Sequence, residues 1–280
     1  MKIVINAQAT TPGLSRGLNL PGLGALFVLT LRQHLRGKRL IILSLLFLLP
    51  TALAIVARLI PHSPKPDAIE FVLVFYLIPH ALITLTALLY SAGIIHDEVE
   101  EQTLTYLLMR PIPRWGLYLT KLAATLVVTI GLTCVFTVLA MIVIHWNTPE
   151  LWGTVISNRV PKVVGLLALT QVSYCALFAI IGMLPRWSLL AGIAYTVLFE
   201  ALLANQPTVA RSLTIMYYFR VLAVRWLDLP DTSAWTIDLT KAPSASNCVL
   251  TLLGASAACT LLGAVLMVRR EFRMKTPEGN

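Results

Sequence analysis

The chain has 280 residues, of which 57% are hydrophobic and only 12% are charged. A soluble domain of this size carries about 25% charged residues, so the composition excludes an ordinary soluble globular protein. The 22 basic residues outnumber the 13 acidic ones. They gather at the ends of apolar runs, which argues against nucleic-acid binding and for a membrane protein.

The cysteines all lie inside apolar runs, and the sequence contains no CxxC pair and no cysteine with a histidine at metal-ligand spacing. This pattern is typical of small side chains in helix packing, so we expect no metal site among Cys134, Cys175, Cys248 and Cys259. The first strong apolar run begins near Leu40, too late and too long for a signal peptide. We therefore expect no cleaved signal peptide.

Residues 20–39 (LPGLGALFVLTLRQHLRGKR) are apolar first and basic afterwards. On a helix, apolar side chains such as Leu31 and Leu35 fall mostly to one side, and Arg32 and Arg36 to another. The pattern predicts an interfacial helix along the inner leaflet. The alternative is a poorly ordered basic tail.

Six apolar segments are long enough to cross a membrane, because about 20 residues of helix span about 30 Å of hydrocarbon. They cover residues 40–60, 69–95, 117–145, 163–184, 187–205 and 248–268. The predicted fold is an all-α integral membrane protein with six transmembrane helices. We expect one transmembrane domain over residues 1–280, divided into a cytoplasmic N-terminus (1–39), a six-helix membrane region (40–268) and a cytoplasmic tail (269–280).

The basic residues set the predicted orientation. If both termini are inside, 14 of the 22 Lys and Arg residues are inside and 8 are outside. Cytoplasmic loops carry the excess of positive charge in membrane proteins, so both termini are predicted to be cytoplasmic. Residues 208–226 then lie outside, where their aromatic side chains predict a short helix or helices on the outer face, followed by a loop around Pro230.

The longest cytoplasmic loop of this topology lies between helices 2 and 3, within residues 93–121 (GIIHDEVEEQTLTYLLMRPIPRWGLYLTK). It begins with four carboxylates, which suit the first turns of a helix because the helix dipole favours negative charge there: Asp97, Glu98, Glu100 and Glu101. An apolar stripe follows at helical spacing, formed by Leu104, Leu107 and Leu108. Pro111 and Pro113 end the helix before helix 3. The pattern predicts a short, rigid cytoplasmic helix over about 97–110.

This loop resembles the permeases of ABC-2 type transporters, which are exporters driven by a separate ATPase. The pattern Glu-x-Glu, Thr-Leu, Leu-Leu, Pro-x-x-Arg and Lys is carried here by Glu98, Glu100, Thr103, Leu104, Leu107, Leu108, Pro111, Arg114 and Lys121. The six-helix layout, the interfacial helix and the external helical segment also fit the family. In one departure, Glu101-Gln102 stand where the family often has a glycine, and they favour a continuous helix.

The resemblance implies a coupling role for this loop, with Asp97 and Glu101 included, in docking on an ATP-binding cassette ATPase subunit. ATP binding would close the ATPases, and the loop would pass that closure to helices 2 and 3, which with helix 5 line the path. It also implies a second permease subunit, identical or similar, in a bacterial inner membrane. GxxxxGK[ST] is absent from the sequence, so we expect no enzyme activity and no cofactor on this chain, with ATP and Mg on the partner ATPase.

Polar residues inside the apolar segments are candidates for the translocation pathway, because burying them in lipid is costly. The candidates are His80, Gln171, Tyr174 and Glu200. Each has an alternative: Glu200 near the outer interface, His80 beside the kink at Pro79, and Gln171 and Tyr174 in helix–helix contacts. We expect His145 to be an anchoring residue at a helix end.

Three other classes of protein compete with this interpretation. An intramembrane protease is disfavoured, because the sequence lacks His-Glu-x-x-His and Gly-x-Ser-x-Gly. An ion-coupled secondary transporter would require intramembrane charges and repeated halves, and neither is clear here. A membrane assembly or structural protein is the remaining alternative. The sequence does not distinguish among drug, lipid, glycan, peptide and ion substrates.

Overall fold

The computed structural model describes residues 20–60, 64–95, 113–146, 148–149, 151–183, 187–205, 209–227, 229, 235 and 242–269. Within these ranges the chain is helical and contains no strand, which confirms the all-α prediction for this part. In chain order the helices are α1 (Leu20–Arg36), α2 (Lys38–Leu59), α3 (Pro66–Glu70), η1 (Phe71–Ile83), α4 (Thr84–Ser91), α7 (Arg114–Ile144), η2 (Leu151–Arg159), α8 (Val160–Ile181), α9 (Ser188–Tyr195), η3 (Thr196–Leu202), η4 (Leu203–Asn205), η5 (Val209–Leu213), α10 (Ile215–Leu227) and α11 (Ala245–Arg269).

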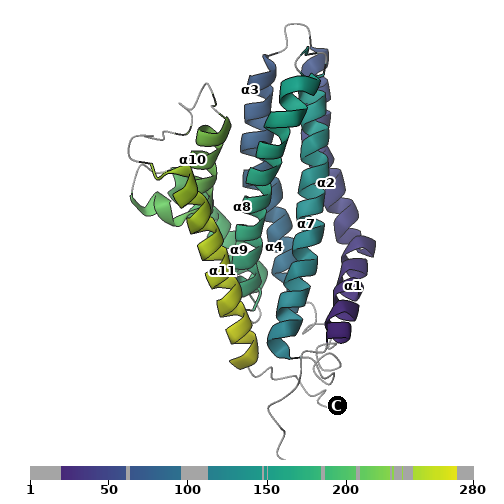
Figure 1. Ribbon diagram of the computed structural model, residues 1–280, viewed down its shortest axis with the longest axis vertical. Coiled ribbons are helices and arrows are strands. Elements are labelled where there is room, and N and C mark those ends of the chain that lie inside the picture. The colour runs from purple at the N-terminus through teal and green to yellow at the C-terminus, as the bar shows by residue number, and fades with distance from the viewer. Residues whose placement is uncertain are drawn as a thin grey trace, which may run out of the picture.

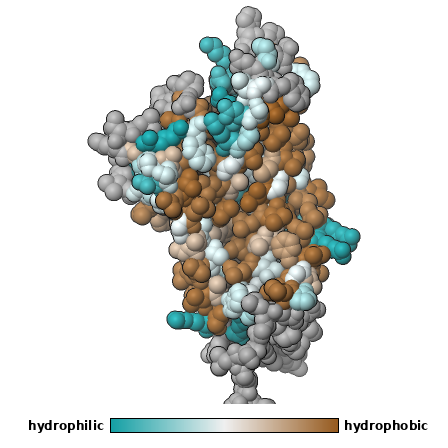
Figure 2. Space-filling view, in the orientation of Figure 1, coloured by the Kyte–Doolittle hydropathy of each residue, from teal (hydrophilic) through white to brown (hydrophobic). Residues whose placement is uncertain are grey.

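The long helices form an elongated bundle (Figure 1). We call the end that holds α1 the α1 end, and the opposite end, where α3 begins, the α3 end. The central helix is α8, which packs against α11, α7, α4 and α10. Apolar residues dominate the middle of the face in Figure 2, as expected of a surface that contacts lipid.

Five helices of the described part are long and apolar enough to cross a membrane: Lys38–Leu59, Pro66–Ile95, Arg114–Ile144, Gly153–Ile181 and Ala245–Arg269. The fifth predicted helix, over 187–205, gives only a shorter apolar helix, Ser188–Leu202. Its 15 residues reach about 22 Å, less than the about 30 Å of hydrocarbon. The predicted helix was therefore too long, because the apolar run on which it was based continues into residues that fold as the short η4.

The segment predicted to be an interfacial helix is helical as α1, which ends at Arg36 and is shorter than the predicted 20–39. The break lies at Gly37, whose extended backbone (φ −70°, ψ 142°) separates α1 from α2. Helix α1 packs along α7 and buries Leu26 and Thr30. A bend at Gly37 thus lets one helix lie against the bundle while the next becomes a membrane span.

The segment predicted to rest on the outer face is helical, as η5 and α10. Helix α10 is part of the bundle, however, because nine of its 13 residues are buried and it packs against α8 and α11. The sequence of α10 explains the difference. Four consecutive apolar residues give the helix apolar side chains all the way round: Val221, Leu222, Ala223 and Val224. The aromatic residues alone had suggested a surface helix.

Gly182 and Gly263 allow close contacts between neighbouring segments. A Cβ atom at Gly182, just beyond α8, would overlap the main chain of Ala92 at the end of the second span. A Cβ atom at Gly263 of α11 would overlap the hydroxyl group of Tyr118 in α7. Small residues serve such contacts in membrane bundles, where packing replaces the hydrophobic effect between helices.

We predict that Gly182→Ala lowers stability by about 1–3 kcal/mol, because the added methyl group meets backbone that cannot rotate away. Gly165→Ala in α8 is the matched control, since nothing lies within 4 Å of its Cβ position. Thermal unfolding in detergent would measure both. A Gly182→Ala protein that melts at or above the temperature of the control would contradict the close approach.

Candidate functional site

The predicted ATPase-coupling residues divide between two parts of the chain. Arg114 and Lys121 are described. The others lie outside the described residues: Asp97, Glu98, Glu100, Glu101, Thr103, Leu104, Leu107, Leu108 and Pro111. Arg114 is the first residue of α7, which begins directly after the extended Pro113. Lys121 is two turns further along and is only 4% exposed, so it faces the interior of the bundle rather than the solvent.

Helix α1 is fixed to α7 near this point. Gly116 of α7 lies under Leu23 of α1, where a Cβ atom would be 3.3 Å from Leu23 Cδ2. Further along, His34 Nε2 and Thr125 Oγ1 are 3.1 Å apart. Movement at the start of α7 would therefore carry α1 with it.

Glu200 has a specific structural partner, the N-terminus of α10. Its Oε1 accepts hydrogen bonds from the Ile215 amide at 3.1 Å and the Tyr195 hydroxyl group at 3.0 Å. Its Oε2 accepts one from the Met216 amide at 3.1 Å. Acidic groups are favourable at helix N-termini, where amides lack intrahelical partners. Glu200 is 3% exposed, and these contacts assign it a capping role.

His80 is held between η1 and α10. The guanidinium group of Arg220 can only donate, so Nη2 donates to His80 Nε2 over 2.8 Å. The proton of the neutral ring is then on Nδ1, which donates to the Tyr76 carbonyl at 2.9 Å. Arg220 is 3% exposed, and its Nη1 also donates to the Ala204 carbonyl at 3.4 Å. Arg220 is one of the eight basic residues that the predicted topology puts outside, and its contact with His80 was not predicted.

Gln171 and Tyr174 are both fully buried in α8. Gln171 Nε2 donates to the sulfur atom of Cys175 at 3.4 Å. The Tyr174 ring stacks on Phe178 with 5.9 Å between the ring centroids. These contacts place both residues in helix packing, which was the alternative to a pathway role.

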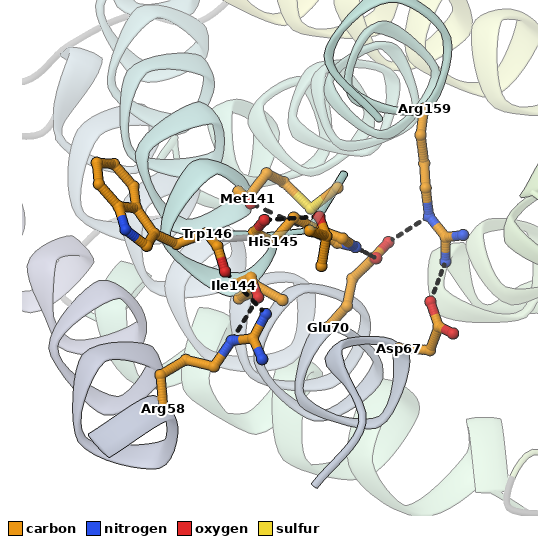
Figure 3. Close-up of polar contacts among 9 residues, drawn as sticks. Arg58, Asp67, Glu70, Met141, Ile144, His145, Trp146 and Arg159 are labelled. Atoms are coloured by element: carbon orange, nitrogen blue, oxygen red, sulfur yellow. Dashed lines mark hydrogen bonds and ion pairs between the residues drawn. The ribbon is translucent and has the colours of Figure 1, made fainter. Parts of the chain in front are cut away.

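At the α3 end, a group of charged residues joins segments that are far apart in the sequence (Figure 3). We call Asp67, Glu70, His145 and Arg159 the polar lock. Arg159 Nε donates to Glu70 Oε1 at 2.9 Å, and its Nη2 lies 3.7 Å from Asp67 Oδ1. Glu70 Oε2 is 3.4 Å from His145 Nε2. The Glu70 side chain is completely buried, and its hydrogen bond with Arg159 joins α3 to η2, while His145 places the end of α7 beside it.

Next to the lock, Arg58 of α2 binds the end of α7. Its Nε donates to the Ile144 carbonyl at 2.8 Å, and its Nη2 donates to the Trp146 carbonyl at 3.3 Å. The last carbonyls of a helix have no intrahelical partners, and a cation there also suits the helix dipole. The α3 end therefore connects all of the first four membrane spans.

His145 was expected to be an anchoring residue, and the structure places it inside this network. Its Nδ1 lies 3.2 Å from the Met141 carbonyl. Burial is the main cause that lowers the pKa of His145 below its ordinary value. The neutral ring carries its proton on Nδ1, so the contact with Glu70 becomes an ion pair only when the ring gains a second proton.

Asp67, Glu70 and His145 offer ligand atoms within 4.8 Å of one another, a spacing that could hold a metal ion. Arg159 argues against that use. Its guanidinium group already donates to Glu70 and lies beside Asp67, so a metal cation would meet a fixed positive charge. The arrangement fits an ion-pair network better than a metal centre.

The helices and their apolar surfaces define a multi-pass membrane protein. The chain belongs to the family described as "ABC-2 family transporter protein", whose model matches residues 25–271. It is therefore a membrane permease component of an ABC transporter, a type of subunit that associates with an ATP-binding cassette ATPase and is generally not catalytic itself. A search of curated proteins found no match.

We predict that Arg159→Gln destabilises the fold by about 3–5 kcal/mol, because it leaves a buried carboxylate without its strongest partner. The Glu70→Gln/Arg159→Gln double variant should recover part of this loss. Asp67→Asn is the control: its side chain is 55% exposed, so it should cost no more than about 1 kcal/mol.

Thermal unfolding of the wild type, Glu70→Gln, Arg159→Gln and the double variant in detergent supplies a double-mutant cycle for Glu70 and Arg159. If the effects of the two single substitutions simply add in the double variant, the polar lock is not energetically coupled.

Proposed function

We propose that this chain is the permease subunit of an ABC exporter, working in a complex of two permease and two ATPase subunits. The second permease is identical or similar. ATP and Mg bind to the ATPase subunits, and this chain performs conformational coupling without bond chemistry. The observation that carries the proposal is the family match over residues 25–271, together with the acidic, leucine-rich and proline-ended segment that joins the second and third spans.

The topology of the proposal has six membrane crossings within one domain over residues 1–280. The five long spans supply five crossings, and α9 with η3 supplies the sixth. A span shorter than the hydrocarbon can be accommodated by local thinning of the bilayer. An even number of crossings puts both termini on one side, in keeping with α1 and the C-terminal end of α11 at the same end of Figure 1.

The positive-inside distribution supports a cytoplasmic location for that end. Residues 36–39 hold three basic side chains at the junction of α1 and α2, and Arg269 ends α11. The α3 end then faces outward, and η5 and α10 form the helical segment between the fifth and sixth crossings, with α10 packed into the bundle. We propose the bacterial inner membrane as the location.

The coupling route begins at about residues 97–110, which would dock on the ATPase. This segment is attached to α4 on one side and to α7 on the other, and α7 carries α1 through the contacts of Gly116 and Thr125. Closure of the ATPases would therefore move the second and third spans together with α1. The second and third spans and α9 would line the path between protomers.

The four candidates for the translocation pathway have different proposed roles, because they differ in burial. His80 belongs to the second span and is only partly buried, so it is the candidate best placed to meet a substrate. Glu200, Gln171 and Tyr174 are buried among protein partners, and their proposed contribution is to hold the helices that form the path.

We predict that Glu98→Gln lowers the ATP hydrolysis that the permease stimulates in its reconstituted complex with a cognate ATPase. The reason is the loss of a carboxylate from the proposed docking helix. Charge-assisted contacts across interfaces commonly contribute about 2–5 kcal/mol, so the affinity of the two subunits should fall at least about tenfold.

Glu278→Gln makes the same chemical change in the C-terminal tail and is the control. Co-purification and stimulated hydrolysis would be compared for the two variants. Equal assembly and equal stimulation in both would sink the docking role of Glu98.

A further inference from the structure

The contact between Glu70 and His145 in the polar lock has no donor when the ring is neutral and the carboxyl group is ionised. The ring atom Nδ1 lies 3.2 Å from the Met141 carbonyl, and a carbonyl can only accept, so the proton of the neutral ring is on Nδ1. The other ring nitrogen, Nε2, then carries a lone pair and faces Glu70 Oε2 at 3.4 Å. An ionised carboxylate can only accept as well. Two acceptors would therefore face each other inside the lock.

Burial prevents both atoms from turning to bulk water instead. The Glu70 side chain is completely buried, and His145 is only 5% exposed. Oε1 of Glu70 accepts from Arg159, whereas Oε2 has no hydrogen-bond partner within the part of the chain that the structure describes. A buried acceptor without a partner is unfavourable. One proton between Oε2 and Nε2 would satisfy both atoms at once.

The same proton balances the charge within the polar lock. Two carboxylates, on Asp67 and Glu70, face the single guanidinium group of Arg159. With a neutral His145 ring the lock therefore carries one excess negative charge, and one added proton makes it neutral. A buried network with balanced charge is more favourable than one with an excess.

Water can deliver this proton through a cavity of about 370 Å³ at the α3 end, which Asp67, His145 and Arg159 help to line. The Asp67 side chain is 55% exposed, so solvent reaches the cavity beside the pair. Arg58 and Lys162 also face this region. Arg58 donates to carbonyls at the end of α7, and Lys162 lines the cavity but is exposed, so water and salt screen its charge.

We propose that Glu70 Oε2 and His145 Nε2 form a proton-binding site, in which one proton taken from water joins the start of the second span to the end of the third. On Nε2 the proton makes an imidazolium–carboxylate ion pair, and on Oε2 it makes a hydrogen bond from the carboxyl group to the ring. Coupled groups bind such a proton as a pair. Its release leaves two facing acceptors and removes one contact between the spans. The site goes beyond the proposed transport function, and proton binding requires no ATPase.

The site makes stability depend on pH in one direction. In the unfolded chain a glutamate and a histidine have ordinary pKa values of about 4.3 and about 6.5, so above about pH 7 they hold no proton between them. Folding then takes up one proton, and stability falls as the pH rises. The contribution is complete below about pH 6.5 and is lost as the pH rises until the folded pair releases its proton. Burial lowers the pKa of His145, so the ring needs the facing carboxyl group to hold this proton.

Thermal unfolding of the purified chain in detergent, measured across pH, tests the site. Between about pH 6.5 and about pH 8.5 the melting temperature of the wild type should fall by at least about 3 °C, as expected for the release of one proton by a chain of this size. Glu70→Gln should remove this fall, because its amide oxygen still accepts from Arg159 and its amide N–H always donates to His145 Nε2. A fall in the wild type no larger than that in Glu70→Gln would overturn the proposal.

His34→Gln is the matched control. It removes a histidine of α1, at the opposite end of the bundle from the polar lock, so it should keep the wild-type fall. Loss of the fall in this variant would assign the titration to His34 and refute the site. If Glu70→Gln does not fold, His145→Gln replaces it, since a glutamine amide donates to Glu70 Oε2 without titrating. An unchanged fall in His145→Gln would contradict the proposal as well.

Zinc ions separate a proton from a metal at the same side chains. Asp67, Glu70 and His145 are close enough to hold a metal ion, although the Arg159 guanidinium group opposes one. Protein purified with EDTA should therefore melt at the same temperature with and without micromolar Zn²⁺ at neutral pH. A rise with Zn²⁺ that Glu70→Gln abolishes would identify a metal site and rule out the proton assignment.

Discussion

Lipid hydrocarbon offers no hydrogen-bond partner, so each backbone amide and carbonyl within it must be satisfied inside the protein. In the part of the chain that the structure describes, helices meet this demand along their lengths. The difficult positions are helix ends and the junctions between them. There the chain uses side chains: Glu200 binds the first amides of α10, and Arg58 binds the last carbonyls of α7. Charge in this bundle is therefore placed where backbone groups or opposite charges require it.

The same constraint explains the region that differs most from the sequence prediction. Helix α9 continues as η3 and η4, and the chain then enters η5 and α10. Glu200 and Arg220 connect these segments, Glu200 through the amides of α10 and Arg220 through the Ala204 carbonyl. In this region a short apolar helix is followed by a buried one, and side chains bind the backbone groups at the ends of these segments. Because α10 also contacts η1 and α8, a movement of the second span would shift α10 as well.

The sequence predicted the long helices well. The third span was expected over 117–145 and is Arg114–Ile144, and the last was expected over 248–268 and is Ala245–Arg269. Apolar length decides these elements, and it can be read locally. The contacts of Glu70 with Arg159 and of His80 with Arg220 join residues 89 and 140 positions apart. They depend on which helices become neighbours, which periodicity and charge counting do not reveal.

A partial signal for the polar lock was present in the sequence. Glu70 lies at the start of the second span and Arg159 shortly before the fourth, so the predicted topology put opposite charges at the same membrane boundary. The burial of Lys121 had no such signal, because it depends on which segments pack against α7. The proposed coupling contacts at 97–111 rest on motif alone and lie outside the described residues.

The polar lock lies at one end of the second and third spans, and Ile95 and Arg114, which flank the proposed coupling segment in the sequence, lie at the other end. The most direct measurement of the central claim is reconstitution of the purified chain with a cognate ATP-binding cassette ATPase. Native mass spectrometry would give the subunit ratio, and transport would be assayed with and without ATP. The account predicts two permease and two ATPase subunits and transport that needs ATP hydrolysis. A chain that remains free of the ATPase, or transports on an ion gradient alone, would contradict it.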